Sequence, residues 1–285
     1  MRATGGTEIR RLSEADIPAA MRLKEAAGWN QTEADWHRLL TLEPDGCFGA
    51  FRDDRLAGTT TTTSYRNELA WIGMVLVDPR QRRQGIATTL MRVALDYLRA
   101  KVATVKLDAT PEGRPLYERF GFRVESVLQR WSGPGDSVAR AANSLESLKR
   151  KEVPDLLKFD RLAFGADRSP LLEALINESA VTPVLIRKPD RTLCGYALAR
   201  RGSAADYVGP VVISDPQQAG TLLEQVLAQL QSARLYVDYN PQCGAEHELS
   251  ARGFVKERDL IRMTFGAPAP GTSPLVFAIA GPEVG

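Results

Sequence analysis

The sequence predicts an α/β protein in which one unit, a mixed and mostly antiparallel sheet flanked by helices, occurs twice. Strand-like runs alternate with amphipathic helical segments through both halves of the chain. A stretch containing glycine and proline, Trp131–Asp136, interrupts this pattern near the middle. Short anchors recur in the same order on either side of the break, which indicates two copies of one unit.

Each anchor in the first half has a counterpart in the second. The pairs are Asp16-Ile17-Pro18 with Glu152-Val153-Pro154, Trp71-Ile72-Gly73 with Tyr207-Val208-Gly209, Asp78-Pro79 with Asp215-Pro216, and Gly121-Phe122 with Gly253-Phe254. Asp108 and Asp238 are likewise matched, at or near the ends of two strand-like runs. We therefore expect a first unit over residues 1–132, a linker over 133–145 and a second unit over 146–285.

In the first half, the expected order is strand, two helices, three strands, helix, strand, short helix and strand. Asp53-Asp54 has the composition of a hairpin turn. Apolar residues from Ile86 to Tyr97 recur on one helical face. The predicted bounds are Glu8–Leu12, a helix from about Asp16 to Gly28, Thr32–Leu42, Cys47–Arg52, Leu56–Tyr65, Leu69–Val77, Gly85–Leu98, Val102–Asp108, Arg114–Arg119 and Phe122–Trp131.

The second half repeats this order more loosely. Lys188–Arg191 has turn composition between two strands, and an apolar helical face runs from Ala219 to Leu230. The predicted strands are Pro183–Arg187, Leu193–Arg200, Leu235–Tyr239, a strand after Phe254 that ends at Phe265, and a terminal strand Leu275–Ala280. The terminal strand is expected to join a sheet, either within the chain or between chains.

The composition excludes several classes of protein. A hydrophobic content of 44% and a net charge of +2 are typical of a globular protein with no general attraction to nucleic acid or anionic membranes. No apolar run reaches the roughly 18 residues needed to span a bilayer, and Met1–Thr7 lacks the apolar core of a secretion signal. Three cysteines without CxxC spacing and two histidines predict a reduced, cytoplasmic protein without a metal site.

The segment with the clearest chemistry is Arg82-Arg83-Gln84-Gly85-Ile86-Ala87-Thr88, which follows an apolar strand and opens a helix. The first N–H groups of a helix lack internal partners, and the helix dipole adds positive charge, so this position favours an anion such as a pyrophosphate. Gly85 allows the backbone to approach a phosphate oxygen. The spacing fits neither a Walker loop nor a dinucleotide fingerprint. The alternative is a solvated basic loop.

This loop resembles the acetyl-CoA signature of the GCN5-related N-acetyltransferases (GNAT), in the form Arg82-x-x-Gly85-x-Ala87. A second element, Leu116-Tyr117-Glu118-Arg119-Phe120-Gly121-Phe122, resembles the string that follows the fifth strand in that family. The resemblance implies one GNAT domain in each half, with strands four and five splayed apart in each sheet. It covers the chain from about Glu8 to Phe265, closely in the first half and more loosely in the second.

The resemblance also implies roles for individual residues. The backbone of Leu76 and Val77 would pair with the pantetheine arm, and the Val75 N–H would face the thioester oxygen. Tyr117, near the sulfur, would protonate the leaving thiolate; the alternative is a core aromatic. The coenzyme-binding residues implied are Leu76, Val77, Arg82, Arg83, Gln84, Gly85, Ile86, Ala87, Thr88 and Tyr117.

The general base is not assigned by this resemblance. Histone-type members carry a glutamate on the fourth strand, at the position that Trp71 occupies here. Asp108, at the end of a strand, is a candidate base, with capping of the turn at Thr110 as the alternative. Glu68 and Glu33 are weaker candidates.

Acceptor contacts in the family come from the first two helices and their link, which here contains Trp29 and Asn30. The alternative for this segment is a helix break with a packed tryptophan and a helix cap. Trp71, Tyr207 and Asp238 are further candidates for the acceptor site, because they lie on the fourth strand or near matching strand ends; the alternative for Tyr207 and Asp238 is a structural role.

The second half lacks both chemical signatures. Between Asp215 and Ala219 stands only Pro216-Gln217-Gln218, and Ala245–Leu249 replaces the tyrosine string, so we expect one coenzyme per chain. The sequence thus predicts an N-acetyltransferase that moves an acetyl group from acetyl-CoA to a primary amine of a small or amino-acid-like acceptor, as a monomer or homodimer. The alternatives are transfer of another acyl group and a non-catalytic acyl-CoA sensor.

Overall fold

The computed structural model describes residues 6–135, 148–267 and 273–285. Its α-helices are α1 (Ile17–Ala26), α2 (Glu33–Leu42), α3 (Ile86–Arg99), α4 (Arg114–Arg119), α5 (Val153–Phe164), α6 (Ser169–Asn177), α7 (Ala219–Leu227) and α8 (His247–Ser250). Its strands are β1 (Glu8–Arg11), β2 (Phe48–Arg52), β3 (Arg55–Tyr65), β4 (Leu69–Val77), β5 (Thr104–Ala109), β6 (Arg123–Pro134), β7 (Val184–Arg187), β8 (Leu193–Arg200), β9 (Asp206–Ile213), β10 (Arg234–Tyr239), β11 (Val255–Gly266) and β12 (Val276–Ala278).

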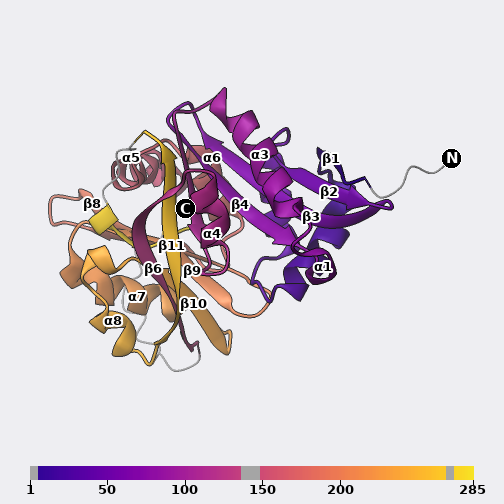
Figure 1. Ribbon diagram of the computed structural model, residues 1–285. Coiled ribbons are helices and arrows are strands. Elements are labelled where there is room, and N and C mark those ends of the chain that lie inside the picture. Colours follow the sequence, from indigo (N-terminus) through magenta and orange to yellow (C-terminus); the bar gives the residue numbers. More distant parts are fainter. Residues whose placement is uncertain (1–5, 136–147, 268–272) are drawn as a thin grey trace.

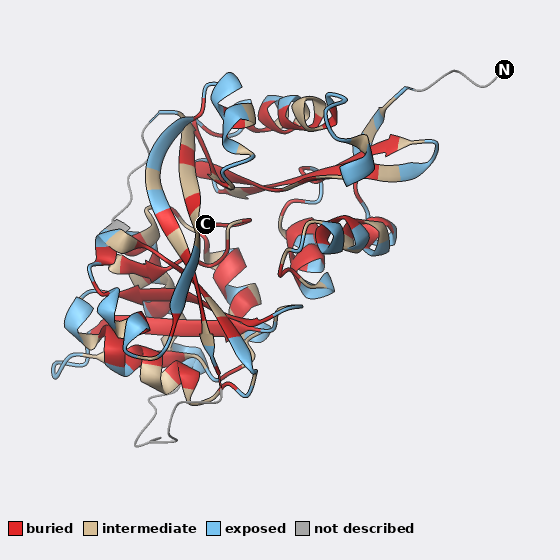
Figure 2. Cartoon of the chain, turned by 60° about the horizontal axis from the view of Figure 1, so that its bottom comes forward, coloured by how far each residue is buried: buried red, intermediate tan, exposed pale blue. Residues whose placement is uncertain are grey.

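All twelve of these strands join one mixed sheet, in the order β1-β2-β3-β4-β5-β11-β6-β10-β12-β9-β8-β7 (Figure 1). The α/β fold with a mixed sheet and flanking helices is therefore confirmed. In the first unit, α3 packs on one face of the sheet, and α1 with α2 packs on the other (Figure 2). The largest apolar cluster combines residues of both halves, among them Trp36 and Trp71 with Leu172 and Tyr196. The two units thus share a core.

The middle of the sheet is built by an exchange of strands. β11, from the second half, pairs antiparallel with β5 of the first half, while β6 of the first half pairs with β10 of the second. β6 and β11 also pair with each other along most of their length, and they are the long strands at the centre of Figure 1. Side chains from β11 are therefore placed beside the fourth and fifth strands of the first unit.

The parallel strands β4 and β5 separate after a short contact. Only Ala70 with Val105 and Trp71 with Lys106 are paired, so the rest of β4 has no ladder on that side. On its other side, the ladder with β3 is interrupted by a bulge at Met74, whose φ is 48°. The splay that the family resemblance implied for the first unit is present.

The second unit has the same splay, but it is filled. β9 and β10 pair only at Leu235 with Asp206 and Tyr236 with Tyr207. Beyond that point the terminal strand β12 lies between them and pairs with both. The predicted terminal strand therefore joins a sheet within the chain.

Two local predictions differ from the structure. The strand expected to end at Trp131 continues to Pro134, because residues 131–134 pair with β10 and β11. No bounds were predicted for α6, which takes the place of the second helix in the repeated order. Residues 136–145 of the predicted linker lie outside the described residues. Among the helices of the described part, none is long and apolar enough to cross a membrane.

Candidate functional site

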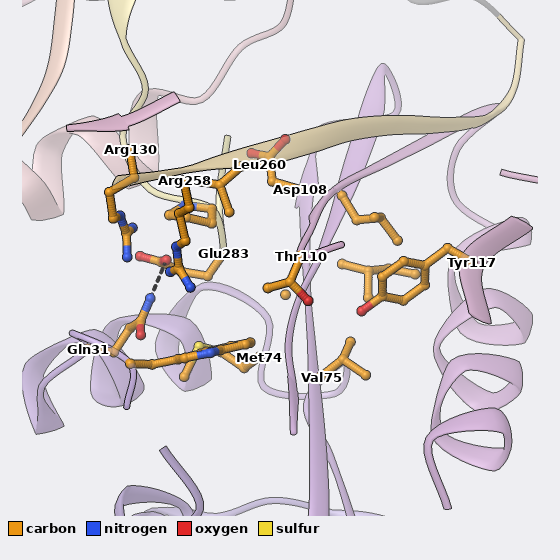
Figure 3. A pocket seen from close by; sticks show the side chains of 15 residues that line it. Gln31, Met74, Val75, Asp108, Thr110, Tyr117, Arg130, Arg258, Leu260 and Glu283 are labelled. Carbon is orange, nitrogen blue, oxygen red and sulfur yellow. Dashed lines mark hydrogen bonds between the residues drawn. The ribbon is translucent and has the colours of Figure 1, made fainter. Parts of the chain in front are cut away.

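A pocket opens where β4 and β5 separate, and both halves of the chain line it (Figure 3). The first half contributes residues of the α1–α2 link, β4, β5, α4 and β6, and the second half contributes β11 and the C-terminal segment. The lining residues are Trp29, Gln31, Ile72, Gly73, Met74, Val75, Leu107, Asp108, Thr110, Tyr117, Arg130, Arg258, Leu260, Pro282 and Glu283.

Tyr117 stands at one end of this pocket. α4 carries it, and the ring packs so closely over Gly113, the residue before that helix, that a β-carbon there would come within 3.1 Å of it. Its side chain packs against Phe122, and its hydroxyl points toward the pocket (Figure 3). Burial raises the pKa of Tyr117 well above its ordinary value of about 10. The phenol is therefore protonated at neutral pH and is able to donate.

Val75 lines the pocket on the same side as Tyr117 (Figure 3). It lies within the β4 bulge, where Thr59 pairs with Leu76 and Thr61 with Gly73, so that Val75 has no partner in the ladder. The Thr59 hydroxyl donates to the Met74 carbonyl at 2.8 Å, which holds the bulge in place. The bulge thus frees backbone at the position where the sequence predicted a donor to a developing oxyanion.

The predicted anion loop has the expected geometry. Gly85 is the N-cap of α3 with φ of 79°, and a β-carbon built there would meet no atom within 4 Å. Ile86 is buried beneath it, and Arg82 and Arg83 are exposed. Gln84 accepts a hydrogen bond from Arg52. Open space above a left-handed glycine, with arginines around it, fits a phosphate that contacts the backbone.

Asp108 does not have the surroundings expected of a general base. Both of its carboxylate oxygens accept hydrogen bonds from Arg262 of β11, each at 2.9 Å, although burial raises the pKa of this carboxyl. Its oxygens are thus occupied by Arg262, and in the turn at Thr110 it is the Thr110 side chain that accepts from the Gly113 N–H. Asp108 therefore joins β5 of the first unit to β11 of the second.

Asp238, its counterpart in the second unit, repeats this arrangement. Its oxygens accept from Arg130 of β6 at 2.8 and 2.6 Å, and the Tyr207 hydroxyl donates to one of them at 3.1 Å. Asp238 is fully buried and does not line the pocket, and Tyr207 lines a smaller neighbouring cavity. The structure therefore does not bring these two candidate acceptor residues to the site.

Of the remaining candidate acceptor residues, one lines the pocket and two are bonded to other parts of the chain. Trp29 lines the pocket. Asn30 does not, because its amide bonds the backbone of Ala204 and Ala205 and fastens the α1–α2 link to the second unit. Trp71 lies under Arg262 and donates to the Pro282 carbonyl, on the side of a different cavity. Both residues are structural for a physical reason, since their polar atoms are already bonded.

The weaker base candidates also lie elsewhere. Glu68 bonds Arg161, Glu33 is exposed at the start of α2, and neither lines the pocket. The alternative reading of the α1–α2 link as a capped helix start is confirmed in part, because Thr32 caps α2.

The C-terminal segment brings in a carboxylate that sequence reasoning missed. Glu283 is buried, and its backbone lies so close to Gly73 of β4 that a β-carbon there would come within 2.7 Å. Its carboxylate accepts from Gln31 at 2.8 Å and from Arg200 at 3.0 Å. Burial raises its pKa, Arg200 and Arg38 oppose that shift, and Asp35 adds to it. Nothing near Glu283 in the sequence marks it, because only the folded tail reaches β4.

Two arginines of the pocket were also missed. Arg130 and Arg258 are directly opposite each other on β6 and β11. Arg130 and Arg262 follow the two Gly-Phe anchors at matching positions, so a closer comparison of the repeats would have found that pair. No comparable signal identifies Arg258, because its place in the pocket results from the strand exchange.

Two family models match the chain, one in each half. Residues 12–122 match a model described as "Acetyltransferase (GNAT) family", and residues 156–278 match one described as "Acetyltransferase (GNAT) domain". The chain is a tandem GNAT protein. It is accordingly a transferase of the acyltransferase class, with the expected arrangement of two GNAT units.

Two relatives align with this tandem GNAT protein over most of their own length. An uncharacterized N-acetyltransferase, YitH of Bacillus subtilis, is 25% identical over 98% of both chains. Holothin acyltransferase of a Pseudoalteromonas species is 24% identical over 91% of this chain and 88% of that protein. A crystal structure of a provisionally assigned acetyltransferase from Pyrococcus horikoshii superposes with a TM-score of 0.82 at 24% identity, covering 100% of this chain and 98% of that one. The similarity between that structure and this one is a similarity of fold.

Proposed function

We propose that this protein transfers an acetyl group from acetyl-CoA to a primary amine of a small or amino-acid-like acceptor. The observation that supports this most is the single pocket that joins the bulged strand β4, the Tyr117 hydroxyl and a buried carboxylate, Glu283. The pocket lies beside the splay of β4 and β5, which leaves strand backbone available to an extended ligand.

The residues available to hold the coenzyme lie along one path. The backbone of Leu76 and Val77 borders the splay, and the segment from Arg82 to Thr88 offers the positive end of α3 to the pyrophosphate. The coenzyme supplies a thioester, whose carbonyl carbon is open to attack by an amine.

The reaction is a direct transfer. The amine nitrogen forms a bond to the acetyl carbon, and the carbon–sulfur bond breaks. In this proposal the Val75 N–H stabilises the carbonyl oxygen as it gains negative charge. Tyr117 gives its proton to the departing thiolate, and burial of the phenol keeps that proton in place at neutral pH.

The amine must also lose a proton. An amine with a pKa of about 10 is only roughly 0.1% neutral at pH 7, a penalty of about 4 kcal/mol. The pocket lining contains two carboxylates, Asp108 and Glu283, and Asp108 is held by Arg262 on both oxygens. We therefore infer that Glu283 accepts the proton, because only one of its oxygens accepts from an arginine, Arg200, while the other accepts from the neutral amide of Gln31. Its raised pKa makes it a stronger base than an exposed glutamate.

Incubation of the full chain with acetyl-CoA and a panel of amines, followed by release of free thiol, tests the activity. The Glu283→Gln variant is expected to lose kcat by about 10²-fold or more. Glu178→Gln is the matched control, because Glu178 bonds Arg38 in the same ion-pair network but lies outside the pocket.

The pH dependence follows from the direction of the shift. Glu283 accepts a proton only when it is ionised, so kcat should rise as the pH increases through its raised pKa and should lose that limb in Glu283→Gln. Tight CoA binding without thiol release from any amine would contradict the proposal and favour an acyl-CoA sensor. Faster turnover of a longer acyl-CoA would favour another acyl group, in line with the name of the holothin acyltransferase relative.

A further inference from the structure

Arg258 is a charged side chain without an acidic partner in the acceptor pocket. It extends from β11 into the pocket beside Glu283 and Gln31 (Figure 3). Its Nε is buried and has no hydrogen-bond partner among the described residues, and no ion pair involves its guanidinium there. Arg258 as a whole is half-buried, so its guanidinium is partly desolvated without gaining a partner, and a group that binds it in the pocket would offset that cost.

The acidic groups around Arg258 already accept hydrogen bonds from other side chains. Asp238 is bonded by Arg130, Asp108 by Arg262, and Glu283 by Arg200 and Gln31. Glu257, the preceding residue, pairs with Arg234. Among the residues that the structure describes, none of these carboxylates lies within ion-pair distance of Arg258, which leaves its guanidinium available to an acidic group of a bound ligand.

The cross-strand register increases the electrostatic cost of an unpaired Arg258. Arg258 stands directly opposite Arg130, beside a bulge of β11, and like charges in that position repel each other. Arg130 is neutralised by Asp238, whereas Arg258 is not. Burial and the charge of Arg130 lower the pKa of Arg258, although the guanidinium stays charged at neutral pH.

We infer that the acceptor of this enzyme carries a carboxylate in addition to its amine, and that Arg258 binds this carboxylate. A guanidinium offers Nε and Nη donors in a fork that matches a carboxylate. Arg258 lies at the end of the pocket away from Tyr117 (Figure 3), whereas the expected coenzyme phosphate site is at Gly85 of α3, which does not line the pocket. The carboxylate therefore belongs to the acceptor. This inference rests on the proposed function and narrows its substrate class to amino acids and similar amine-bearing acids.

Matched acceptor pairs test the inference. Each amino acid is compared with its own carboxamide, which keeps the amine and removes the negative charge. Wild type is expected to prefer the acids, and Arg258→Met should lower kcat/KM for acids by about 10- to 100-fold, the value of a charge-assisted hydrogen bond, with no loss for the amides. The ratio between variants cancels the different basicities of the two amines.

Arg234→Met is the control for the loss of one arginine nearby. Arg234 pairs with Glu257, is half exposed and lies outside the pocket, so its replacement should leave the preference for acids unchanged. Charge reversal in Arg258→Glu should remove turnover of acids more completely than Arg258→Met. Equal losses for acids and amides, or a wild type that acetylates both equally, would overturn the inference.

A measurement without turnover separates this inference from the proposed function. Millimolar amino acids and N-acetylamino acids should raise the melting temperature of the wild type but not of Arg258→Met. If the wild type acetylates no amine yet shows this shift, the carboxylate site stands and the acetyl transfer fails. If acetylation occurs and no acid produces an Arg258-dependent shift, the carboxylate site fails alone.

Discussion

The two halves of this chain build the same splayed pair of strands and use it differently. In the first unit, β4 and β5 separate and leave an open path, and Arg82–Gly85 stands between the preceding turn and α3. In the second unit, β12 lies between β9 and β10, and α7 follows Pro216–Gln218 without such a loop. One splay is left free for a ligand, whereas the other is closed by the chain's own C-terminal strand.

The comparison distinguishes the residues that hold the two units together from those expected to take part in the reaction. Both units keep a buried aspartate on the strand after the splay, bonded to an arginine of the exchanged strand from the other unit: Asp108 with Arg262, and Asp238 with Arg130. The repeated pair therefore joins the units, whereas the features present once, Tyr117 and the Gly85 loop, are the ones expected to carry the reaction.

The largest effect should come from the tyrosine that the second unit lacks. Tyr117→Phe removes the proposed proton donor and should lower kcat by about 10²–10⁴-fold while the Kd for CoA stays unchanged, as measured by thiol release and calorimetry. His247→Phe, in the corresponding string of the second unit, changes an exposed side chain and should have no effect. Unaltered kcat in Tyr117→Phe would remove this residue from the mechanism.

The next largest effect should be a loss of stability when one of the aspartate–arginine pairs between the units is broken. Asp238→Asn leaves Arg130 buried without its charge partner and should lower the free energy of unfolding by about 3–5 kcal/mol in denaturant titration. The double variant Asp238→Leu with Arg130→Met should recover most of this loss, because neither charge remains buried. A loss below about 1 kcal/mol in the single variant would show that the pair does not join the units.

The smallest effect should come from the coenzyme loop. Gly85→Val adds a branched side chain at a left-handed position that faces open space, and should raise the Kd for CoA by about 10-fold or more. Gly244→Val in the second unit is a matched control, since its φ is 75° and its surroundings are equally open. Both should pay the backbone cost of about 1–2 kcal/mol in stability, but only Gly85→Val should lose affinity. Equal affinities would place the pyrophosphate elsewhere.

Prediction from the sequence was most successful where the signal is local. Most strands and helices have the expected bounds to within a few residues, because hydrophobic periodicity and turn residues determine them over short distances. Gly85 and Tyr117 were found because each belongs to a contiguous string. Asp108, Asn30 and Trp71 were placed on the correct segments, but their partners come from residues more than a hundred positions away.

The sequence by itself determined the repeat, the α/β architecture, the anion loop and the loss of that loop in the second unit, since each of these depends on residues that are close together in the chain. Only the tertiary structure decided that β6 and β11 change places, that β12 closes the second splay, and that Glu283 and Arg258 enter the first unit's pocket. The physical reason is that pairing between distant strands depends on the register and packing of the whole sheet, which no local pattern specifies. The loop at Gly85 thus identified the enzyme family, and the exchanged strands supply the residues that we expect to select its acceptor.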